Sequence, residues 1–386
     1  MDLQEINITP DRPLLQDKHT NESEDNVVEC TYSTGGNTYS TKLHVIVQGN
    51  RSLSHSIVTF HDVGLNSVSN FGPLMNSDCM DPVTNKYCIY HINAPGQEEH
   101  AKTLPSGIVY PTMENLAEMI PKVFSNFGIK SAICMGSGAG ANVFLRFAFK
   151  NPTMVEGLVA VNPTISPVGN LSWIGEKITN WTTPFSEQIM NYYFTKSELE
   201  LSNHELLETH RNHFKRFMNE ENVISFMKSY ERRGDINVLR SHDPQLVDKL
   251  TLKCQTLIIV GDHSPFVDEA VEVNSRLNVK KTTFLKMADA GGMILEEQIF
   301  NVAEALTYFL QGLGHIPGVM MTRLARSRTI SNSSAGSADG DHKRIRTLSG
   351  GNSHHSHSPQ FTSDADQIIE TKREKDNAHL VPNAVC

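Results

Sequence analysis

Short apolar runs alternate with amphipathic segments along most of this chain. A run or a strict alternation of apolar residues predicts a strand, and apolar residues recurring every three or four positions predict a helix. The expected strands cover 27–47 (a hairpin around Gly35-Gly36-Asn37), 56–60, 87–91, 131–135, 155–161, 256–260 and 282–285. The expected helices cover 113–127, 141–150, 267–277 and 297–310. This alternation predicts a mostly parallel sheet with helices on both faces.

The alternation is interrupted between residues 166 and 250, where only helical patterns occur, among them 173–181 and 197–233. A helical insertion late in a parallel sheet is typical of a cap over the carboxyl edge of the strands, where such folds place a ligand crevice. The expected organisation is a flexible arm (1–26), a first core part (27–165), a helical cap (166–250), a second core part (251–313) and a disordered tail (314–386).

Composition and charge exclude several classes of protein. The 386-residue chain has a net charge of −9, so it lacks the basic surface by which proteins bind nucleic acid. It shows neither a secretory signal nor an apolar run of about 18 residues, the length that a membrane-spanning helix needs. The six cysteines have no paired spacing, and the tract His354-His355-Ser356-His357 is expected to be solvated rather than to bind metal. We therefore expect a cytoplasmic protein without a metal ion or a cofactor.

The segment Gly136-Ser-Gly138-Ala-Gly140 has the spacing of a nucleophile elbow. In this motif a strand turns sharply into a helix, and the flanking glycines leave room for an exposed nucleophile at the central position. The central residue here is Gly138, which has no side chain. The sequence thus predicts the backbone turn of a hydrolase without the atom that attacks the substrate.

The two partner positions of a catalytic triad are altered as well. The acid normally follows a late strand, and the corresponding segment Gly261-Asp-His-Ser264-Pro265 places Ser264 there. The histidine normally follows the last strand, and Gly292 stands at that position. Because base and nucleophile act as a unit, these three replacements predict that the chain has no triad catalysis.

The oxyanion segment also departs from a working site. In this type of fold a His-Gly pair after the third strand offers backbone N–H groups to a developing oxyanion. This chain has His61-Asp62, which brings a carboxylate to that place. Two like charges about 4 Å apart repel by roughly 4 kcal/mol at an effective dielectric of about 20. That repulsion would remove the benefit of an oxyanion hole.

Polar side chains near these positions are candidates for ligand contacts in the crevice: His61, Asp62, Ser137, Asp262 and His263. Ser137 precedes the elbow tip, where we expect its side chain to pack beside the turn rather than to attack. Asp262 lies at a strand end, which favours a capping role. Neither histidine has a nucleophile to serve, so hydrogen bonds that fix loops are their favoured role.

Several segments together resemble the N-myc downstream-regulated (NDRG) family. They are His61-Asp-Val-Gly-Leu-Asn66, Asn93-Ala-Pro-Gly-Gln97, Gly136-Ser-Gly-Ala-Gly140, Asn151-Pro-Thr-Met-Val-Glu-Gly157, Val260-Gly-Asp-His-Ser-Pro265, Lys286-Met-Ala-Asp-Ala-Gly-Gly292 and Met321-Thr-Arg-Leu-Ala-Arg-Ser-Arg-Thr329. The resemblance implies an α/β-hydrolase fold without hydrolase activity, a cytoplasmic role in differentiation, stress and growth signalling, and phosphorylation of the tail. Asn93 stands where an Asp is usual, and the tail beyond Ser333 lacks the tandem repeats of some members.

Two tail segments share a pattern that basophilic kinases recognise. Arg326-Ser-Arg-Thr-Ile-Ser331 and Arg344-Ile-Arg-Thr-Leu-Ser349 each carry arginines five and three positions before a serine. Such arginines suit an acidic kinase groove that pairs guanidinium groups with carboxylates. We expect phosphorylation of Ser331 and Ser349 by kinases of the AGC class, with Thr329 and Thr347 as neighbouring acceptors.

Three functions compete on these observations. The first is a non-catalytic adaptor with protein partners and kinase input through its tail. The second is a hydrolase with an unconventional apparatus in the crevice. The third is a receptor whose crevice binds a small molecule or lipid, and peripheral association of the chain with membranes is compatible with it. The missing triad favours the first.

Overall fold

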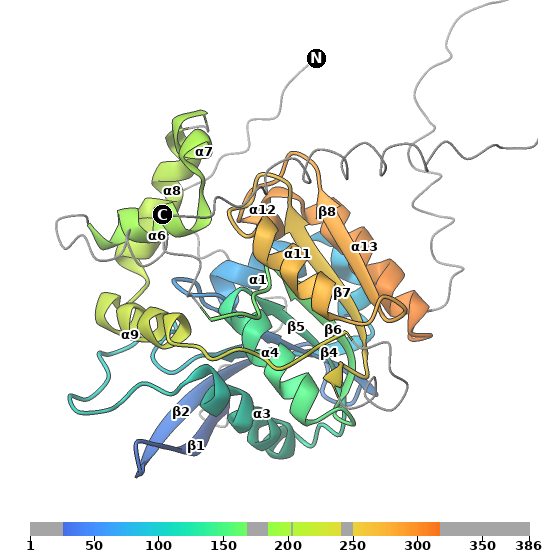
Figure 1. Cartoon of the computed structure of the whole chain (residues 1–386), viewed down its shortest axis with the longest axis horizontal. Coiled ribbons are helices and arrows are strands. Elements are labelled where there is room, and N and C mark those ends of the chain that lie inside the picture. Colours follow the sequence, from blue (N-terminus) through green and yellow to red (C-terminus); the bar gives the residue numbers. More distant parts are fainter. Residues whose placement is uncertain (1–25, 168–183, 202–203, 241–249, 317–386) are drawn as a thin grey trace, which may run out of the picture. The chain divides into compact units, whose positions relative to one another are not determined.

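An eight-stranded, mostly parallel sheet forms the centre of the computed structural model, which describes residues 26–167, 184–201, 204–240 and 250–316 (Figure 1). The strands are β1 (Val27–Thr34), β2 (Asn37–Gln48), β3 (His55–Phe60), β4 (Tyr87–Asn93), β5 (Ala132–Ser137), β6 (Val155–Val161), β7 (Gln255–Gly261) and β8 (Thr282–Met287). Their spatial order is β1-β2-β4-β3-β5-β6-β7-β8. The β1–β2 and β2–β4 pairs are antiparallel, and every pair from β4 to β8 is parallel. The predicted sheet is confirmed.

The helices follow the strands much as the apolar periodicity predicts. They are α1 (Ser67–Met75), α2 (Asp81–Thr84), α3 (Met113–Phe127), α4 (Ala139–Lys150), α6 (Phe185–Tyr193), α7 (Lys196–Leu201), α8 (His204–Arg216), α9 (Glu220–Glu231), α11 (Val267–Arg276), α12 (Ile294–Glu297) and α13 (Ile299–Gly312), with a 3₁₀ turn at Asp78–Met80. The expected helix 297–310 corresponds to α13 with bounds shifted by two residues, and the short helix α12 before it was not predicted. The two helices are separated at Gln298, whose φ of −125° and ψ of 42° are not helical.

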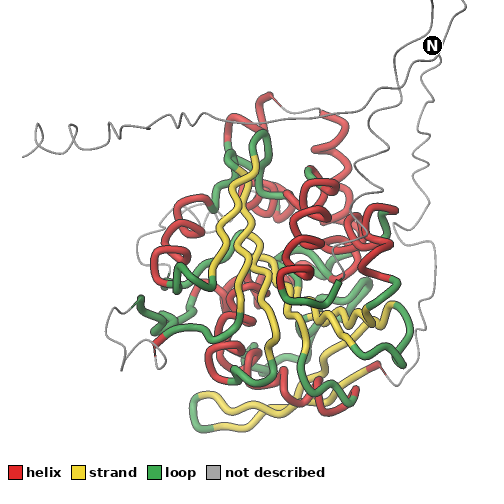
Figure 2. The backbone as a smooth tube through the Cα atoms, turned by 90° about the vertical axis from the view of Figure 1, so that its right-hand side faces the viewer, coloured by secondary structure: helices red, strands yellow, loops and turns green. Residues whose placement is uncertain are grey.

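Apolar side chains of the strands pack on both faces of the sheet. Along β3, Ile57 belongs to one apolar core and Val58 to the other. The same alternation occurs along β6, where Leu158 and Val159 face opposite sides. This period of two follows from the pleat of a strand. Figure 2 shows the strands between helices on either side, so each face is covered.

The residues between β6 and β7 supply the helices α6 to α9, which are grouped beside the sheet in Figure 1. The expected run 197–233 is divided into α7, α8 and α9, and α6 was not predicted by the periodicity. The expected helix 173–181 lies outside the described residues, as do the arm up to residue 25 and the tail from residue 317.

The described cysteines are free thiols: Cys30, Cys79, Cys88, Cys134 and Cys254. Burial raises the pKa of the Cys254 thiol to about 11, so this thiol stays protonated and unreactive near neutral pH. In the described part of the chain, none of the helices is both long enough and apolar enough to cross a bilayer.

Candidate functional site

The turn from β5 into α4 passes through a single residue, Gly138. Its φ of 48° and ψ of −108° lie outside the regions that residues with side chains normally occupy. The Gly138 N–H donates to the Val161 carbonyl at 2.9 Å, which fixes the turn to β6. The backbone therefore has the sharp strand-to-helix shape that the glycine spacing predicts.

The carboxylate of Asp62 fills the space above this turn. A Cβ atom placed on Gly138 would lie 2.0 Å from both Cγ and Oδ2 of Asp62. Asp62 follows β3 and is fully buried. The position where a hydrolase carries its nucleophile is thus taken by an acidic side chain from the loop after the neighbouring strand β3.

The same carboxylate accepts hydrogen bonds from two backbone N–H groups that would form an oxyanion hole. The N–H of Ala139, the residue after the elbow tip, donates to Asp62 Oδ1 at 2.8 Å, and that of Val63 donates at 2.7 Å. In active hydrolases the equivalent pair of donors receives the substrate oxygen. The sequence predicts that Asp62 repels a developing oxyanion, and the structure adds that Asp62 occupies its binding site.

Burial and hydrogen bonding shift the pKa of this carboxylate in opposite directions. Loss of solvent raises the pKa of Asp62 to about 6, and the N–H groups of Ala139 and Val63 limit this rise. The hydroxyl of Tyr192 also donates to Asp62 Oδ1, at 3.2 Å. Because a pKa of about 6 lies below neutral pH, Asp62 is mainly ionised at pH 7 and behaves as a built-in anion in the hole.

His61 is held beside Asp62 by two hydrogen bonds. Its Nδ1 is 2.7 Å from the Asp62 carbonyl oxygen, and its Nε2 accepts from the Ala94 N–H at 3.0 Å. An accepting Nε2 places the proton on Nδ1, so the ring is neutral. Burial lowers the pKa of His61 to about 4, in agreement with this tautomer. Both nitrogens are used, so His61 fixes the loop between β3 and α1.

Burial lowers the pKa of three further histidines to the same value of about 4. We refer to the whole set as the low-pKa histidines: His61, His91, His210 and His213. His91, for example, lies on β4 between Thr59 Oγ1 and Gln48 Oε1, at 2.8 Å and 3.1 Å. These side chains are neutral structural groups near neutral pH.

The two remaining triad positions are occupied by structural contacts. The Ser264 hydroxyl donates to Asn162 Oδ1 at 3.2 Å and accepts from the Phe266 N–H, also at 3.2 Å. At Gly292, an added Cβ would lie 2.2 Å from the carbonyl oxygen of Tyr193. The backbone at the end of α6 therefore stands where a histidine side chain would begin.

Helix α6 closes the crevice above these positions. The Tyr193 hydroxyl donates to the Val63 carbonyl at 2.7 Å, while Tyr192 reaches Asp62. Ile189 lies against Gly64 on the same loop, where an added Cβ would meet its side chain at 3.0 Å. One short helix thus covers both the oxyanion segment and the vestigial histidine position.

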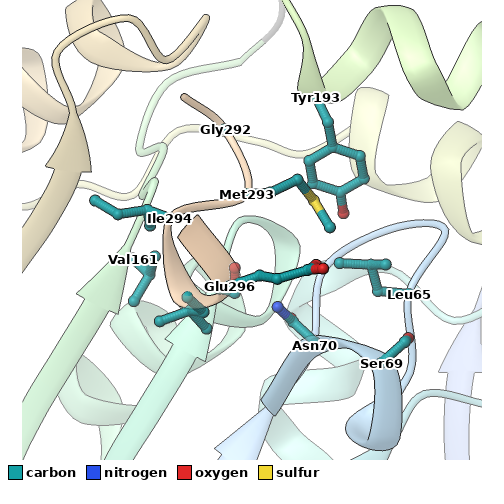
Figure 3. A pocket seen from close by; sticks show the side chains of 11 residues that line it. Leu65, Ser69, Asn70, Val161, Tyr193, Gly292, Met293, Ile294 and Glu296 are labelled. Atoms are coloured by element: carbon teal, nitrogen blue, oxygen red, sulfur yellow. The ribbon is translucent and has the colours of Figure 1, made fainter. Parts of the chain in front are cut away.

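A small pocket remains beside the elbow (Figure 3). It is lined by Leu65, Ser69, Asn70, Ser137, Val161, Tyr193, Gly292, Met293, Ile294, Leu295 and Glu296. A water molecule could place its centre anywhere within about 10 Å³ of this pocket, so the pocket has room for one water molecule. Figure 3 shows the Glu296 side chain directed into this space toward Leu65. A pocket of this size does not take a lipid or a metabolite.

The five candidate crevice residues are engaged in different contacts. Ser137 is 4% exposed and lines the pocket, whereas His61 and Asp62 are engaged in internal hydrogen bonds. Asp262 Oδ1 accepts from the Ala290 N–H at 3.3 Å, which ties the end of β7 to the loop after β8 and does not cap α11, whose N-cap is Phe266. The His263 side chain is 62% exposed, with Nδ1 3.7 Å from Asp262. No constellation of nucleophile, base and acid forms among these five.

The model of the Ndr family matches residues 35–317. The chain belongs to the Ndr family. Protein NDRG1 of Xenopus tropicalis is 40% identical over 342 residues, which cover 88% of this chain and 85% of that protein. Protein NDRG2 of Danio rerio is 38% identical over 356 residues, covering 91% and 94% of the two chains. The predicted family is confirmed.

Solved structures similar to this Ndr-family chain confirm its α/β-hydrolase fold. An esterase from Thermogutta terrifontis aligns with a TM-score of 0.56 and 18% identity, over 74% of this chain and 98% of that one. The enol-lactonase of Burkholderia xenovorans aligns with a TM-score of 0.55 and 16% identity, over 73% and 100%. At such low identity the likeness concerns the fold alone.

Two residues of the site were not predicted from the sequence, and the predicted tail sites lie outside the described residues. The motif patterns missed Tyr192 and Tyr193, because nothing local indicates that α6 reaches back to the loop after β3. The donors Val63 and Ala139 are implied by the hydrolase pattern, but their common acceptor is not. The predicted phosphorylation sites, namely Thr329, Ser331, Thr347 and Ser349, lie outside the described residues.

Proposed function

We propose that this Ndr-family protein is a non-catalytic signalling adaptor, whose folded part binds protein partners and whose tail receives kinase input during differentiation, stress and growth. The observation that carries the proposal is the position of Asp62. Its Oδ1 holds both oxyanion donors, Ala139 and Val63, and its carboxyl group fills the space above Gly138. A crevice in which the protein's own side chain occupies the reaction centre supports a role other than ester or amide hydrolysis.

The energetic barrier to a hydrolytic role is large. A substrate carbonyl could reach the two N–H groups only if Asp62 left them. Hydrogen bonds to a charged acceptor contribute about 1.5–3 kcal/mol each, so release of both costs roughly 3–6 kcal/mol before any chemistry begins. Even then, the positions of Gly138, Ser264 and Gly292 offer no nucleophile, acid or base.

Esterase assays on the full chain test the non-catalytic proposal. The purified protein is incubated with p-nitrophenyl esters of several chain lengths and with a fluorophosphonate probe, beside an active esterase as positive control. We expect neither turnover above buffer nor covalent labelling. Turnover or labelling that disappears in Ser137→Ala would overturn the proposal, because Ser137 lines the residual pocket.

The receptor alternative has less support, because the pocket beside the elbow has room for about one water molecule. A thermal-shift screen against lipids and metabolites addresses it. A ligand at about a hundred times its dissociation constant stabilises the folded state by ~2.7 kcal/mol, which a thermal shift detects readily. A reproducible shift that is lost on Tyr193→Ala would favour the receptor over the adaptor.

We propose further that AGC-class kinases phosphorylate Ser331 and Ser349 in the cytoplasm. The free cysteines support a reducing compartment. Incubation of the full chain with such a kinase, followed by mass spectrometry, should place phosphate on these serines, with Thr329 and Thr347 as secondary acceptors. A double variant with Ser331→Ala and Ser349→Ala should lose most incorporation, and unchanged incorporation would refute the assignment.

Phosphorylation would change how the basic tail segments meet other surfaces. Each phosphate adds about −1.5 to −2 charge at neutral pH, which offsets the arginines that precede it. Peripheral association with anionic lipid should therefore weaken on phosphorylation. Flotation with phosphatidylserine vesicles, before and after kinase treatment, measures this change, and equal flotation of both forms would argue against a lipid-binding tail.

A further inference from the structure

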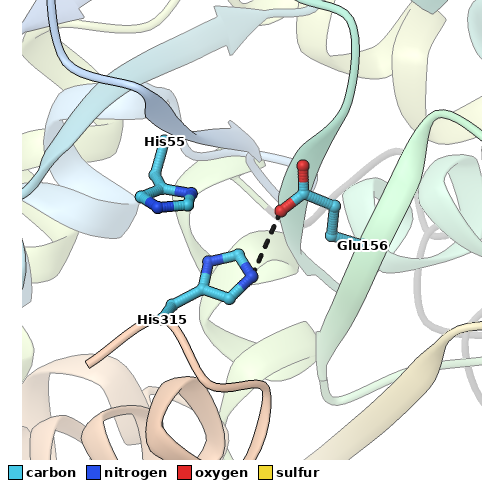
Figure 4. Close-up of side chains that lie close together, drawn as sticks. All are labelled: His55, Glu156 and His315. Atoms are coloured by element: carbon cyan, nitrogen blue, oxygen red, sulfur yellow. Dashed lines mark ion pairs between the residues drawn. The ribbon is translucent and has the colours of Figure 1, made fainter. Parts of the chain in front are cut away.

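Three potential metal ligands meet at the end of the sheet opposite the Gly138 turn. His55 is the first residue of β3, Glu156 is the second residue of β6, and both strands run parallel to β5 between them. His315 lies just beyond the end of α13 and its N–H bonds to the Leu310 carbonyl. Figure 4 shows the three side chains converging from these separate elements.

The distances within this cluster are short. One ligand atom from each residue can be chosen so that all lie within 4.8 Å of one another. His315 Nε2 is 3.3 Å from Glu156 Oε2, and the ring centroids of His55 and His315 are 4.5 Å apart. Ligand atoms around a tetrahedral zinc ion lie about 3.4 Å apart, so small side-chain rotations would close the set around an ion.

The surroundings of the cluster hold its groups in place and leave one of them unsatisfied. The Ser131 hydroxyl donates to Glu156 Oε1, which leaves Oε2 directed at His315. The Tyr87 ring stacks parallel to His315, with an interplanar angle of 5° and a centroid separation of 6.1 Å. Within the described residues, His315 Nδ1 is buried and has no hydrogen-bond partner. The Ser131–Glu156 hydrogen bond is an outer contact of the kind that orients ligands in known metal sites.

We propose that His55, Glu156 and His315 bind a divalent transition-metal ion, with Zn²⁺ as the best match. Two imidazoles and one carboxylate are a ligand set that zinc accepts, with a water molecule in the fourth position. Calcium and magnesium prefer oxygen ligands alone, so they fit this cluster poorly. Bound zinc would fasten the turn after α13 to β3 and β6, just before the chain continues into its C-terminal segment.

Zinc titration of the full chain tests the site. Because the tail tract could bind zinc by itself, the background carries the substitutions His354→Asn, His355→Asn and His357→Asn. After treatment with a chelator, isothermal titration with ZnSO₄ should show one equivalent bound. In the same background, His55→Asn and Glu156→Gln should each weaken binding at least tenfold.

A matched control separates this cluster from an ordinary histidine–carboxylate pair. His44 Nε2 lies 3.5 Å from Glu98 Oε1, without a third ligand among the described residues, so His44→Asn should leave zinc binding unchanged. Circular dichroism verifies the fold of each variant, and titration with Co²⁺ should give visible absorption bands that depend on His55. Zinc binding that is absent from the background, or unchanged in both cluster variants, would overturn the proposal.

Discussion

Adding a single methyl group at the elbow tip is the sharpest test of how this crevice is closed. In Gly138→Ala the new Cβ would lie 2.0 Å from the carboxyl carbon of Asp62, far inside van der Waals contact. The backbone cannot withdraw, because the Gly138 N–H is bound to Val161 and α4 begins at the next residue. The Asp62 carboxylate must therefore leave its position.

The expected loss of stability follows from the contacts of Asp62. Its hydrogen bonds with Val63, at 2.7 Å, and Ala139, at 2.8 Å, are charge-assisted and contribute about 1.5–3 kcal/mol each. A φ of 48° adds roughly 1–2 kcal/mol of strain for alanine. The total of about 4–8 kcal/mol is a large part of the 5–15 kcal/mol that stabilises a typical domain. We expect Gly138→Ala to unfold at much lower urea concentration or to fail to fold.

Urea denaturation followed by circular dichroism measures this effect, and Gly128→Ala is the matched control. Gly128 also has a positive φ, 69°, but nothing lies within 4 Å of its added Cβ. The free energy of unfolding of Gly128→Ala should fall only by the conformational strain that alanine adds there, about 1–2 kcal/mol. In the double variant Asp62→Gly with Gly138→Ala, the loss in free energy of unfolding should be smaller than the sum of the two single losses by about 2 kcal/mol or more. A cost for Gly138→Ala equal to that for Gly128→Ala would refute the reasoning.

Three further predictions concern the surroundings of this site. In Gly292→Ala the new Cβ would meet backbone at 2.2 Å, so the free energy of unfolding measured with urea should fall by several kcal/mol. The control Gly312→Ala, with nothing within 4 Å of its Cβ, should keep this free energy or raise it by up to about 1 kcal/mol. Tyr192→Phe removes a donor to Asp62, so we expect a loss of about 1–2 kcal/mol and, in carboxyl-resolved NMR titration, a higher pKa for Asp62. The low-pKa histidines stabilise the folded state above pH 6.5, and this contribution is lost as the pH falls toward 4. Burial raises the pKa of Asp62 to about 6 and that of Glu269 to about 7, so these two carboxyls contribute stability at low pH and lose it as the pH rises. The raised pKa values of Glu231, Glu296 and Glu297 oppose the histidines as well, so the test removes one carboxyl at a time. In Glu269→Gln, stability measured by urea should fall more steeply than in the unchanged protein as the pH is lowered from 7 to 5, by about 1 kcal/mol per pH unit, and an unchanged profile would contradict the assignment.

Local patterns in the sequence predict most of the sheet and its long helices. Helix α3 has the bounds that its apolar stripe predicts, because Thr112 caps its start and Gly128 ends it in a left-handed conformation. Helix α1 was missed, since its only strong signal is the capping box of Asn66 with Ser69, and Pro73 lies inside it. Periodicity detects helices with a continuous apolar stripe and overlooks short ones that packing stabilises.

The candidate site divides in the same way. The elbow turn could be predicted, because its glycine spacing is a local property of a strand that turns into a helix. The occupant of that turn could not, since Asp62 lies in the loop after β3 and its position depends on where Ala139 and Val63 direct their N–H groups. The closing contacts of Tyr192 and Tyr193 escaped for a further reason: they come from α6, a helix that the periodicity did not predict.

The closed positions of this crevice depend on one another, and this dependence explains why one substitution would not restore a triad. Serine at position 138 requires the removal of Asp62, because the two side chains would share the same space. Removal of Asp62 leaves the N–H groups of Val63 and Ala139 free for a substrate, but Gly292 still cannot become histidine while the Tyr193 carbonyl stands 2.2 Å from its Cβ position. Moving that carbonyl means lifting α6, which is itself held by the Tyr193 hydroxyl on Val63. A serine–histidine pair at these two positions would therefore require simultaneous changes in the loop after β3, at the elbow and in α6.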